Sequence, residues 1–315
     1  MKKTFLFGVL YLFVIILILP PVGVFIGGRI KQNKEQKKEP FDTVKVYITS
    51  EDKVVEMNTS QYLKEVVGAE MPATFAYEAL KAQAVAARTY LCAKMDEDHE
   101  EHKGGAVCTD YKHCKAWLPE SERKAAWEED KREEYWSRVS KAVDETAGEI
   151  IKYKGEPISA VFHSTSSGKT ENSKDVWGKD VPYLRSVESK GDELSPKFLS
   201  EFSCTAEEFC QVVSNNIDNT DWNSGLFSDI VRSDAGGIIK ITLGGVEVKG
   251  TAFREIFELQ STNVQIEQAE DKITMKVKGN VHGVGMSQYG ANFMGNNGST
   301  YKEILTYYYT GTTIG

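Results

Sequence analysis

The sequence predicts an α+β protein, with a helical portion and antiparallel β-sheet portions around a groove, behind one N-terminal transmembrane helix. Apolar residues recur at helical spacing between residues 59 and 146, whereas segments that alternate apolar and polar residues dominate the second half. Residues 4–28 contain no charged side chain. A span of that length can cross the roughly 30 Å hydrocarbon core of a bilayer.

The composition limits the size, the partners and the redox chemistry. The chain has 315 residues, 41% of them hydrophobic, which is enough for one large domain or two modest ones. Its formal net charge of −8 argues against a nucleic-acid-binding protein. Five cysteines are too few for a disulfide scaffold, and the odd number leaves at least one thiol unpaired within the chain.

Three regions follow one another along the chain. Residues 1–28 are predicted to form a transmembrane anchor, and a cleaved signal peptide is the alternative. Residues 29–42 form a charged linker without apolar periodicity, and residues 43–315 form the main domain. Positive residues flank both ends of the anchor, and their distribution alone favours a cytoplasmic position for that domain.

The first elements of the main domain are two strands and a helix. Residues 43–49 alternate in the manner of a strand, and a second strand begins near Val54. Thr59 or Ser60 is the predicted N-cap of the helix, which Gly68 is expected to end.

A lone carboxylate, Glu70, follows this helix and precedes Pro72, so that it occupies a fixed turn. The next helix, residues 76–94, is rich in alanine and can pack closely against its neighbours. Lys81 and Arg88 lie two turns apart on this helix and point the same way. A ligand-binding role for them competes with a solvated basic edge.

An irregular hydrophilic segment then brings together Cys108, His113 and Cys114. Sulfur and imidazole groups at this spacing can hold Zn²⁺. A disulfide between the two cysteines, or no bond at all, are the alternatives. His99 and His102 lie nearby and are candidates for a further ligand.

The remaining elements alternate between helices and strands. Residues 149–163 have the signature of a hairpin with its turn at 154–157. Predicted helices cover residues 120–146, 205–217, 251–258 and 301–309, and predicted strands cover 238–243, 246–249 and 273–277. Cys204 and Cys210 lie six residues apart in a predicted insertion, 190–235.

Two polar loops complete the pattern. Hydroxyl and imidazole groups between residues 162 and 172 suit hydrogen bonds to a polyhydroxylated ligand, although an ordinary loop has the same composition. Trp177 and Tyr183 follow, either as core residues or as sugar-stacking residues. The glycine-rich run 279–295 lacks the G-x-G-x-x-G order of a nucleotide-binding loop.

Three segments in order resemble the stage II sporulation protein D family. They are EMPATFAYEALKAQAVAARTY, then ISAVFHSTSSGKTENSKDVWG with PYLRSV, and finally HGVGMSQYGA with the closing YYTGT. The resemblance runs from about residue 43 to residue 315 and implies a membrane-anchored lytic transglycosylase of endospore-forming bacteria. The segment C-T-D-x-x-H-C-x-A-W resembles the clostridial branch, for which a zinc ion near the acid is implied.

The resemblance also implies roles for individual residues. The catalytic acid falls on Glu70, and the helix cations fall on Lys81 and Arg88. The substrate-binding motifs fall on His163, Ser164, Ser166 and Gly168, and on His282, Gly283, Ser287 and Gln288. The chain departs from the family pattern at Ser167, Asn280 and Val281, where glycine is common, and this loosens the loop assignments.

A single fixed carboxylate indicates a particular reaction. Glycosidases usually need two carboxylates, but N-acetylmuramic acid can supply its own nucleophile, the C6 hydroxyl. Glu70 would protonate the glycosidic oxygen and then accept the C6 proton as the 1,6-anhydro ring closes. This role requires a raised pKa, which Ala69, Met71 and Phe75 are expected to provide. Lys81 and Arg88 are therefore expected farther along a glycan-binding groove.

The implied ligands are peptidoglycan glycan strands, preferably stripped of stem peptides, and the implied partners are stage II sporulation proteins P (an amidase) and M. The implied location is the mother-cell membrane, with an extracytoplasmic catalytic domain that faces the intermembrane space. Two other functions remain open. One is a non-catalytic glycan-binding amidase enhancer, and the other is a zinc hydrolase that uses Cys108 and His113.

Overall fold

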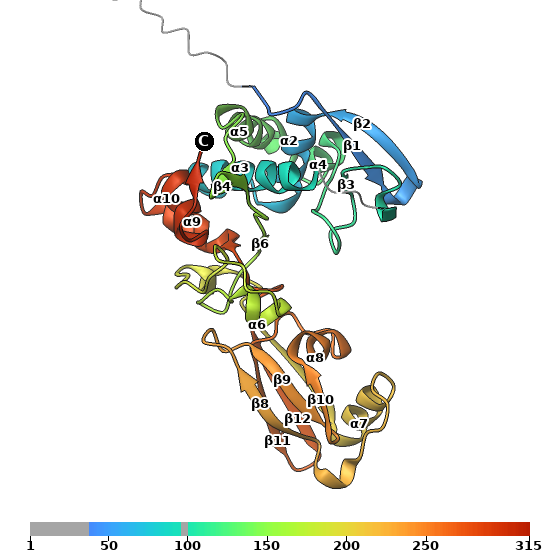
Figure 1. Cartoon of the computed structure of the whole chain (residues 1–315). Helices are drawn as coiled ribbons and strands as arrows, with labels where there is room; N and C mark the ends of the chain where they lie inside the picture. The colour runs from blue at the N-terminus through green and yellow to red at the C-terminus, as the bar shows by residue number, and fades with distance from the viewer. Residues whose placement is uncertain (1–37, 96–99) are drawn as a thin grey trace, which may run out of the picture. The chain divides into compact units, whose positions relative to one another are not determined.

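The computed structural model describes residues 38–95 and 100–315 (Figure 1). The predicted anchor and the linker up to residue 37 lie outside these residues. Within the described ranges, no helix combines the length and apolar character needed to cross a bilayer. The fold is mixed α+β, as predicted, with helices and several antiparallel sheets.

A small sheet and a group of helices form the first half of the fold. β1 (Thr43–Ile48) pairs antiparallel with β2 (Lys53–Asn58), which confirms both predicted strands, and β3 (Val107–Cys108) joins β1 in parallel. The principal helices here are α2 (Thr59–Glu70), α3 (Tyr77–Met95), α4 (Glu120–Ala125) and α5 (Arg132–Glu145). Two C-terminal helices, α9 (Gln288–Asn296) and α10 (Tyr301–Tyr308), pack against α3.

Two helix boundaries differ from the prediction. The N-cap of α2 is Asn58, whose side chain accepts a backbone N–H at 3.1 Å, rather than Thr59 or Ser60. The helix predicted over 120–146 breaks into α4 and α5. The break lets Trp127 turn back onto Tyr135, with the two ring centroids 5.6 Å apart.

Gly68 does not end α2, contrary to the prediction. It lies inside the helix, where an added Cβ atom would make an ordinary van der Waals contact with the Trp136 ring at 3.4 Å. The helix continues to Glu70, and Met71 ends it with an extended backbone. Glu70 therefore projects from the last turn of a helix.

The alanine-rich helix packs closely, as its composition predicts. A Cβ atom at Gly295 of α9 would lie 2.7 Å from the Cβ of Ala76, just before α3. Most of α3 is buried between its neighbours. This close packing holds the last turn of α9 against the start of α3.

Two three-stranded antiparallel sheets enclose a second hydrophobic core (Figure 1). One has the order β10-β9-β8 and the other β11-β12-β7. Their bounds are β7 Leu199–Thr205, β8 Phe227–Arg232, β9 Ile238–Leu243, β10 Val246–Lys249, β11 Val264–Ala269 and β12 Lys272–Lys278. The helices α7 (Ala206–Ser214) and α8 (Gly250–Ile256) cover this core, in which Phe209 stacks on Phe257.

The predicted elements of this region are confirmed, but β7, β8 and β11 were not predicted. The segment 190–235 contributes β7 and β8 to these two sheets, in addition to its predicted helix. All five cysteines lie in the described ranges and are free thiols, so the alternative disulfide between Cys108 and Cys114 does not form.

Short strands connect the two polar loops. The hairpin is confirmed in part: β4 (Ile151–Tyr153) pairs with β5 (Glu156–Pro157) and with the C-terminal β14 (Thr313–Ile314). Of the second strand predicted over 158–163, only β6 (Phe162–His163) forms a regular strand. It pairs in parallel with β13 (Met286–Ser287). This pairing brings the loop after β6 beside the start of α9.

Candidate active site

Glu70 lines a pocket of about 240 Å³. The pocket is formed by the end of α2, Arg123 of α4, the loop after β6, the segment before β7 and the start of α9. Its lining comprises Ala69, Glu70, Met71, Pro72, Arg123, Ser164, Ser195, Pro196, Lys197, Gln288 and Tyr289. Three predicted site residues, Glu70, Ser164 and Gln288, therefore come together although they are far apart in the sequence.

The Glu70 carboxylate is held by two groups. Its Oε1 accepts the backbone N–H of Ala116 at 2.8 Å, and the Gln288 side chain also hydrogen-bonds to it. Burial raises the pKa of Glu70, while the positive charge of Lys115 and these two hydrogen bonds act in the opposite direction. The raised pKa agrees with the expectation for a catalytic acid.

Two residues near the site lie outside the predicted set, Lys115 beside Glu70 and Gln83 beside Gln288. Lys115 is buried, with its Nζ 3.9 Å from the Phe162 ring centroid and 4.4 Å from that of Tyr90. Burial lowers the pKa of Lys115 to about 8, against the attraction of Glu70. Gln83 of α3 is fully buried and accepts a 3.4 Å hydrogen bond from Gln288 Nε2. Neither residue has a spacing in the sequence that marks it.

The described lining of this pocket carries more cationic than anionic side chains. Among the described residues that line it, Glu70 is the single carboxylate, beside two cations, Arg123 and Lys197. The Arg123 Nε is buried and makes no hydrogen bond within the described structure. Its guanidinium lies 4.8 Å from the Trp127 ring centroid, which holds it in place.

Lys81 and Arg88 do not line this pocket, which agrees with their expected position away from Glu70, but both cations are paired within the protein. The Lys81 ammonium binds Glu78 at 2.9 Å and Glu145 at 3.4 Å. Arg88 is fully buried, and its Nη2 donates to Glu39 at 2.9 Å and to the Val143 carbonyl at 3.1 Å. The end of the linker is therefore docked on the domain, and Arg88 has a structural role.

We expect the Arg88→Ala variant to lose about 3–5 kcal/mol of unfolding free energy, because it leaves the Glu39 carboxylate desolvated without its partner. Lys81→Ala is the matched control, since Lys81 is partly exposed, and its loss should stay below about 1 kcal/mol. Urea unfolding of both variants measures the difference. Equal stability of the two variants would contradict the structural role of Arg88.

Two predicted loop serines are also structural. The hydroxyls of Ser166 and Ser287 both donate to the carboxylate of Asp192, and all three residues are buried. Ser287 additionally caps α9 by accepting the Gly290 N–H at 3.2 Å. Asp192, which was not predicted, thus joins the two loops, and neither hydroxyl is presented to the Glu70 pocket.

The remaining predicted loop residues lie away from Glu70. His163 is buried beneath His282, with ring centroids 5.7 Å apart, and its Nδ1 bonds to the Val284 carbonyl at 3.1 Å. His282 and Gly283 line a second pocket. Gly168 has a φ of +99°, which glycine adopts without strain, and its role is in the turn.

A cluster of four side chains fits a metal ion. His102, Cys108, His113 and Cys114 place one donor atom each within 4.8 Å of the others. The three predicted ligands are therefore adjacent, and His102 is the fourth, with its Nε2 3.6 Å from the Cys114 Sγ. Two thiols and two imidazoles form a donor set that suits tetrahedral Zn²⁺. Cys114 lies two residues before Ala116, which binds Glu70.

One family model and several known proteins are similar to this chain. The sequence model of one family, described as stage II sporulation protein, matches residues 47–153. Stage II sporulation protein D of Bacillus subtilis is 37% identical over 274 residues, which cover 86% of this chain and 78% of that protein. Its counterpart in Bacillus amyloliquefaciens is 34% identical over 88% of this chain and 80% of that protein. A Bacillus subtilis protein named amidase enhancer is 28% identical over 80% of this chain and 40% of its own length.

Proposed function

The chain belongs to the stage II sporulation protein D family, and from that premise we propose that it is a lytic transglycosylase of peptidoglycan. The observation that carries the proposal is Glu70, a carboxyl group with a raised pKa in a pocket that holds no second carboxylate among its described lining residues. Hydrolysis normally needs a second carboxylate to activate water or to attack the sugar. Attack by a hydroxyl of the substrate itself does not.

Glu70 would act first as an acid and then as a base. Its proton passes to the glycosidic oxygen as the bond from C1 of N-acetylmuramic acid breaks. The resulting carboxylate then takes the proton of the C6 hydroxyl as this oxygen bonds to C1. The Ala116 amide and Gln288 hold the carboxyl group for both transfers. No water is consumed in the reaction, and Glu70 ends in its protonated form.

Arg123 is the proposed anchor for the lactyl carboxylate of the substrate, in place of Lys81 and Arg88. It lines the same pocket as Glu70, and its buried Nε has no hydrogen-bond partner within the described residues. An unpaired buried donor is costly, so a carboxylate ligand would gain a charge-assisted hydrogen bond there.

A zinc ion on His102, Cys108, His113 and Cys114 would be a fixed cross-link of the segment that supplies Ala116. The ligands themselves hold that segment against β1, since Cys108 lies in β3.

We further propose that residues 1–28 anchor the chain in the mother-cell membrane, with the catalytic domain extracytoplasmic. Stage II sporulation proteins P and M are the proposed partners, and peptide-stripped glycan is the preferred substrate.

Mass spectrometry of digested, peptide-free glycan tests the proposed reaction. The expected products end in 1,6-anhydro-N-acetylmuramic acid. Hydrated reducing ends would show a hydrolase instead. The relative named amidase enhancer makes amidase activation the second candidate. An intact glycan together with faster turnover by an added amidase would favour that function.

The pH dependence of cleavage should follow the protonated form of Glu70. Because the pKa of Glu70 is raised, the acid form persists above the ordinary carboxyl pKa and is lost as the pH rises through the shifted value. Lys115→Met removes a positive charge that opposes this shift, so it should move the alkaline limb of the kcat/KM profile to higher pH. A limb that stays in place or moves to lower pH would contradict the assignment of that limb to Glu70.

A further inference from the structure

Two buried glutamines continue the hydrogen bonding of Glu70 into the core. Gln288, the first residue of α9, is 5% exposed, and its side-chain amide hydrogen-bonds to the Glu70 carboxyl group. Gln83 belongs to α3 and is fully buried. The Gln288 Nε2 donates to the Gln83 Oε1 at 3.4 Å. The three side chains therefore form one chain of hydrogen bonds that begins at the pocket.

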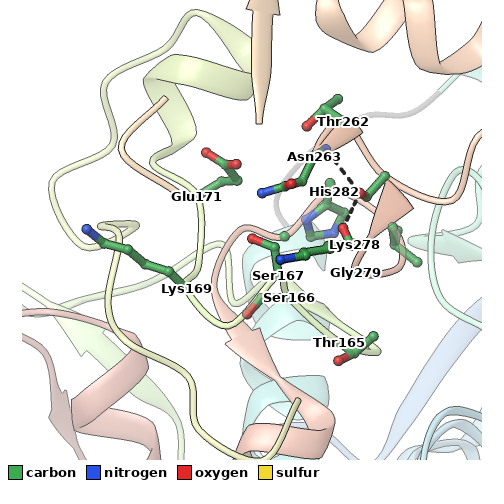
Figure 2. Close-up of a pocket in the computed structure, with 13 residues that line it drawn as sticks. Thr165, Ser166, Ser167, Lys169, Glu171, Thr262, Asn263, Lys278, Gly279 and His282 are labelled. Atoms are coloured by element: carbon green, nitrogen blue, oxygen red, sulfur yellow. Dashed lines mark hydrogen bonds between the residues drawn. The ribbon is translucent and has the colours of Figure 1, made fainter. Parts of the chain in front are cut away.

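Gln83 lies outside the space in which a ligand would bind. The lining of the Glu70 pocket includes Gln288 but not Gln83. The second pocket, whose lining Figure 2 shows, includes neither glutamine. Any influence of Gln83 on a reaction at Glu70 therefore passes through Gln288.

The amide of Gln83 is not fixed in one orientation by other hydrogen bonds. Within the described part of the chain, its Oε1 has Gln288 as its single partner, and its buried Nε2 has none. A glutamine amide carries an acceptor oxygen and a donor NH₂ group of nearly equal size. Half a turn about its terminal C–C bond exchanges the two without a change of volume, so this site accommodates both orientations.

The two glutamines can therefore adopt two matched arrangements. In the first, the Gln288 Nε2 donates to both Gln83 and Glu70, which suits a carboxylate. If both amides invert, the Gln83 Nε2 donates to the Gln288 Oε1, and this oxygen also accepts the O–H of a protonated Glu70. Each arrangement has the same two contacts with donor and acceptor exchanged, so hydrogen bonding alone disfavours neither.

The other neighbours of Glu70 favour its carboxylate form. The Ala116 N–H is always a donor, so Oε1 remains an acceptor and the proton of the acid form lies on Oε2. Lys115 acts on this carboxyl group with its positive charge, and Arg123 and Lys197 are the cations that line the pocket. Among these neighbours, the inverted amide is the group that offers an acceptor to the acid proton.

We propose that Gln83 is a positioning residue that acts through Gln288, and that the two amides invert together when Glu70 exchanges its proton. The Gln288 oxygen holds the acid form until the glycosidic oxygen takes the proton. The Gln288 nitrogen then stabilises the carboxylate, which accepts the C6 proton. No covalent bond changes in either glutamine. The catalytic use of the inversion rests on the proposed function, whereas the inversion itself requires only that Glu70 titrates.

Side-chain amide NMR of the full chain with ¹⁵N-labelled glutamine tests the inversion without a substrate. The Gln83→Met variant identifies the Gln83 Nε2 signal by its absence. We expect this signal to shift with pH along the same curve as the ¹³C-labelled carboxyl carbon of Glu70, because the Gln83 Nε2 gains a partner in the acid arrangement. In Glu70→Gln the signal should no longer respond to pH.

Gln288→Met separates the hydrogen-bonded chain from the electric field of Glu70. It keeps the charge of Glu70 but removes the link to Gln83, so the Gln83 signal should lose most of its response. A full response that persists in Gln288→Met or in Glu70→Gln would overturn the proposal. So would a wild-type Gln83 signal that stays constant while Glu70 titrates.

The kinetic consequence is measured separately. Gln83→Met should lower kcat by about two- to tenfold, the range for one hydrogen bond, and should leave KM unchanged because Gln83 lies outside the pocket. Thr89→Val is the matched control, since it removes a buried 2.9 Å hydrogen bond between the same helix and the Ile151 N–H, and its kcat should stay at the wild-type value. An equal loss of kcat in both variants would overturn the positioning role. A Gln83 signal that follows Glu70 in a protein that cleaves no glycan would leave the inversion standing and remove the transglycosylase.

Discussion

Glu70→Gln is expected to lower the rate of glycan cleavage by about 10²–10⁴-fold, the usual contribution of a positioned general acid. Glutamine keeps the shape of the side chain and its carbonyl can still accept the Ala116 N–H, but it has no proton to give. Discontinuous assays that count 1,6-anhydro ends would measure the loss. Binding of the uncleaved glycan should change little.

The matched control is Gln288→Glu, because Gln288 is the residue whose side-chain amide hydrogen-bonds to the Glu70 carboxyl group. It places a second carboxyl group next to Glu70 and should raise the pKa of Glu70 further, without removing the acid. Full activity of Glu70→Gln would exclude Glu70 as the acid. It would also return the zinc hydrolase to consideration if chelation alone abolished turnover.

Removal of two of the proposed zinc ligands is expected to have the second large effect. Cys108→Ser with Cys114→Ser should abolish stoichiometric zinc, measured by elemental analysis, and should lower Tm. Binding at a hundredfold excess over Kd contributes about 2.7 kcal/mol, which corresponds to about 5–10 °C for a domain of this size. Cleavage should fall as well, because Ala116 would no longer be held against Glu70.

Two other cysteines provide the control for this experiment. Cys204 and Cys210 belong to the second core region and do not form part of the four-residue cluster. Their double serine variant should keep both the zinc content and the cleavage activity. Loss of activity in the Cys108/Cys114 variant at full zinc occupancy would show that the thiols act without the metal.

Local sequence was sufficient for the features that depend on local geometry. Glu70 before a proline, the close-packing helix α3 and the Cys108–His113–Cys114 spacing were all recognisable from adjacent residues. The strands of β9, β10 and β12 were also predicted, because each has a clear apolar pattern.

Features that depend on distant partners were not predictable in this way. Lys81 and Arg88 share one helical spacing, but only Arg88 meets Glu39, a residue 49 positions earlier, and becomes buried. Ser166 and Ser287 have the composition of ligand-binding loops, yet both are satisfied by the remote Asp192. Lys115 lies in an irregular segment where no periodicity reveals burial.

The docking of Glu39 onto Arg88 limits the distance from the membrane at which the domain can act. If residues 1–28 are embedded in a bilayer, the tether that can extend is limited to residues 29–37, since the chain is fixed to the domain from residue 38 onwards. At about 3.3–3.6 Å per residue, about nine residues span at most about 30 Å. The domain would then reach only the layer of cell wall nearest its own membrane. Lengthening this tether with a flexible insert should let it work on more distant glycan.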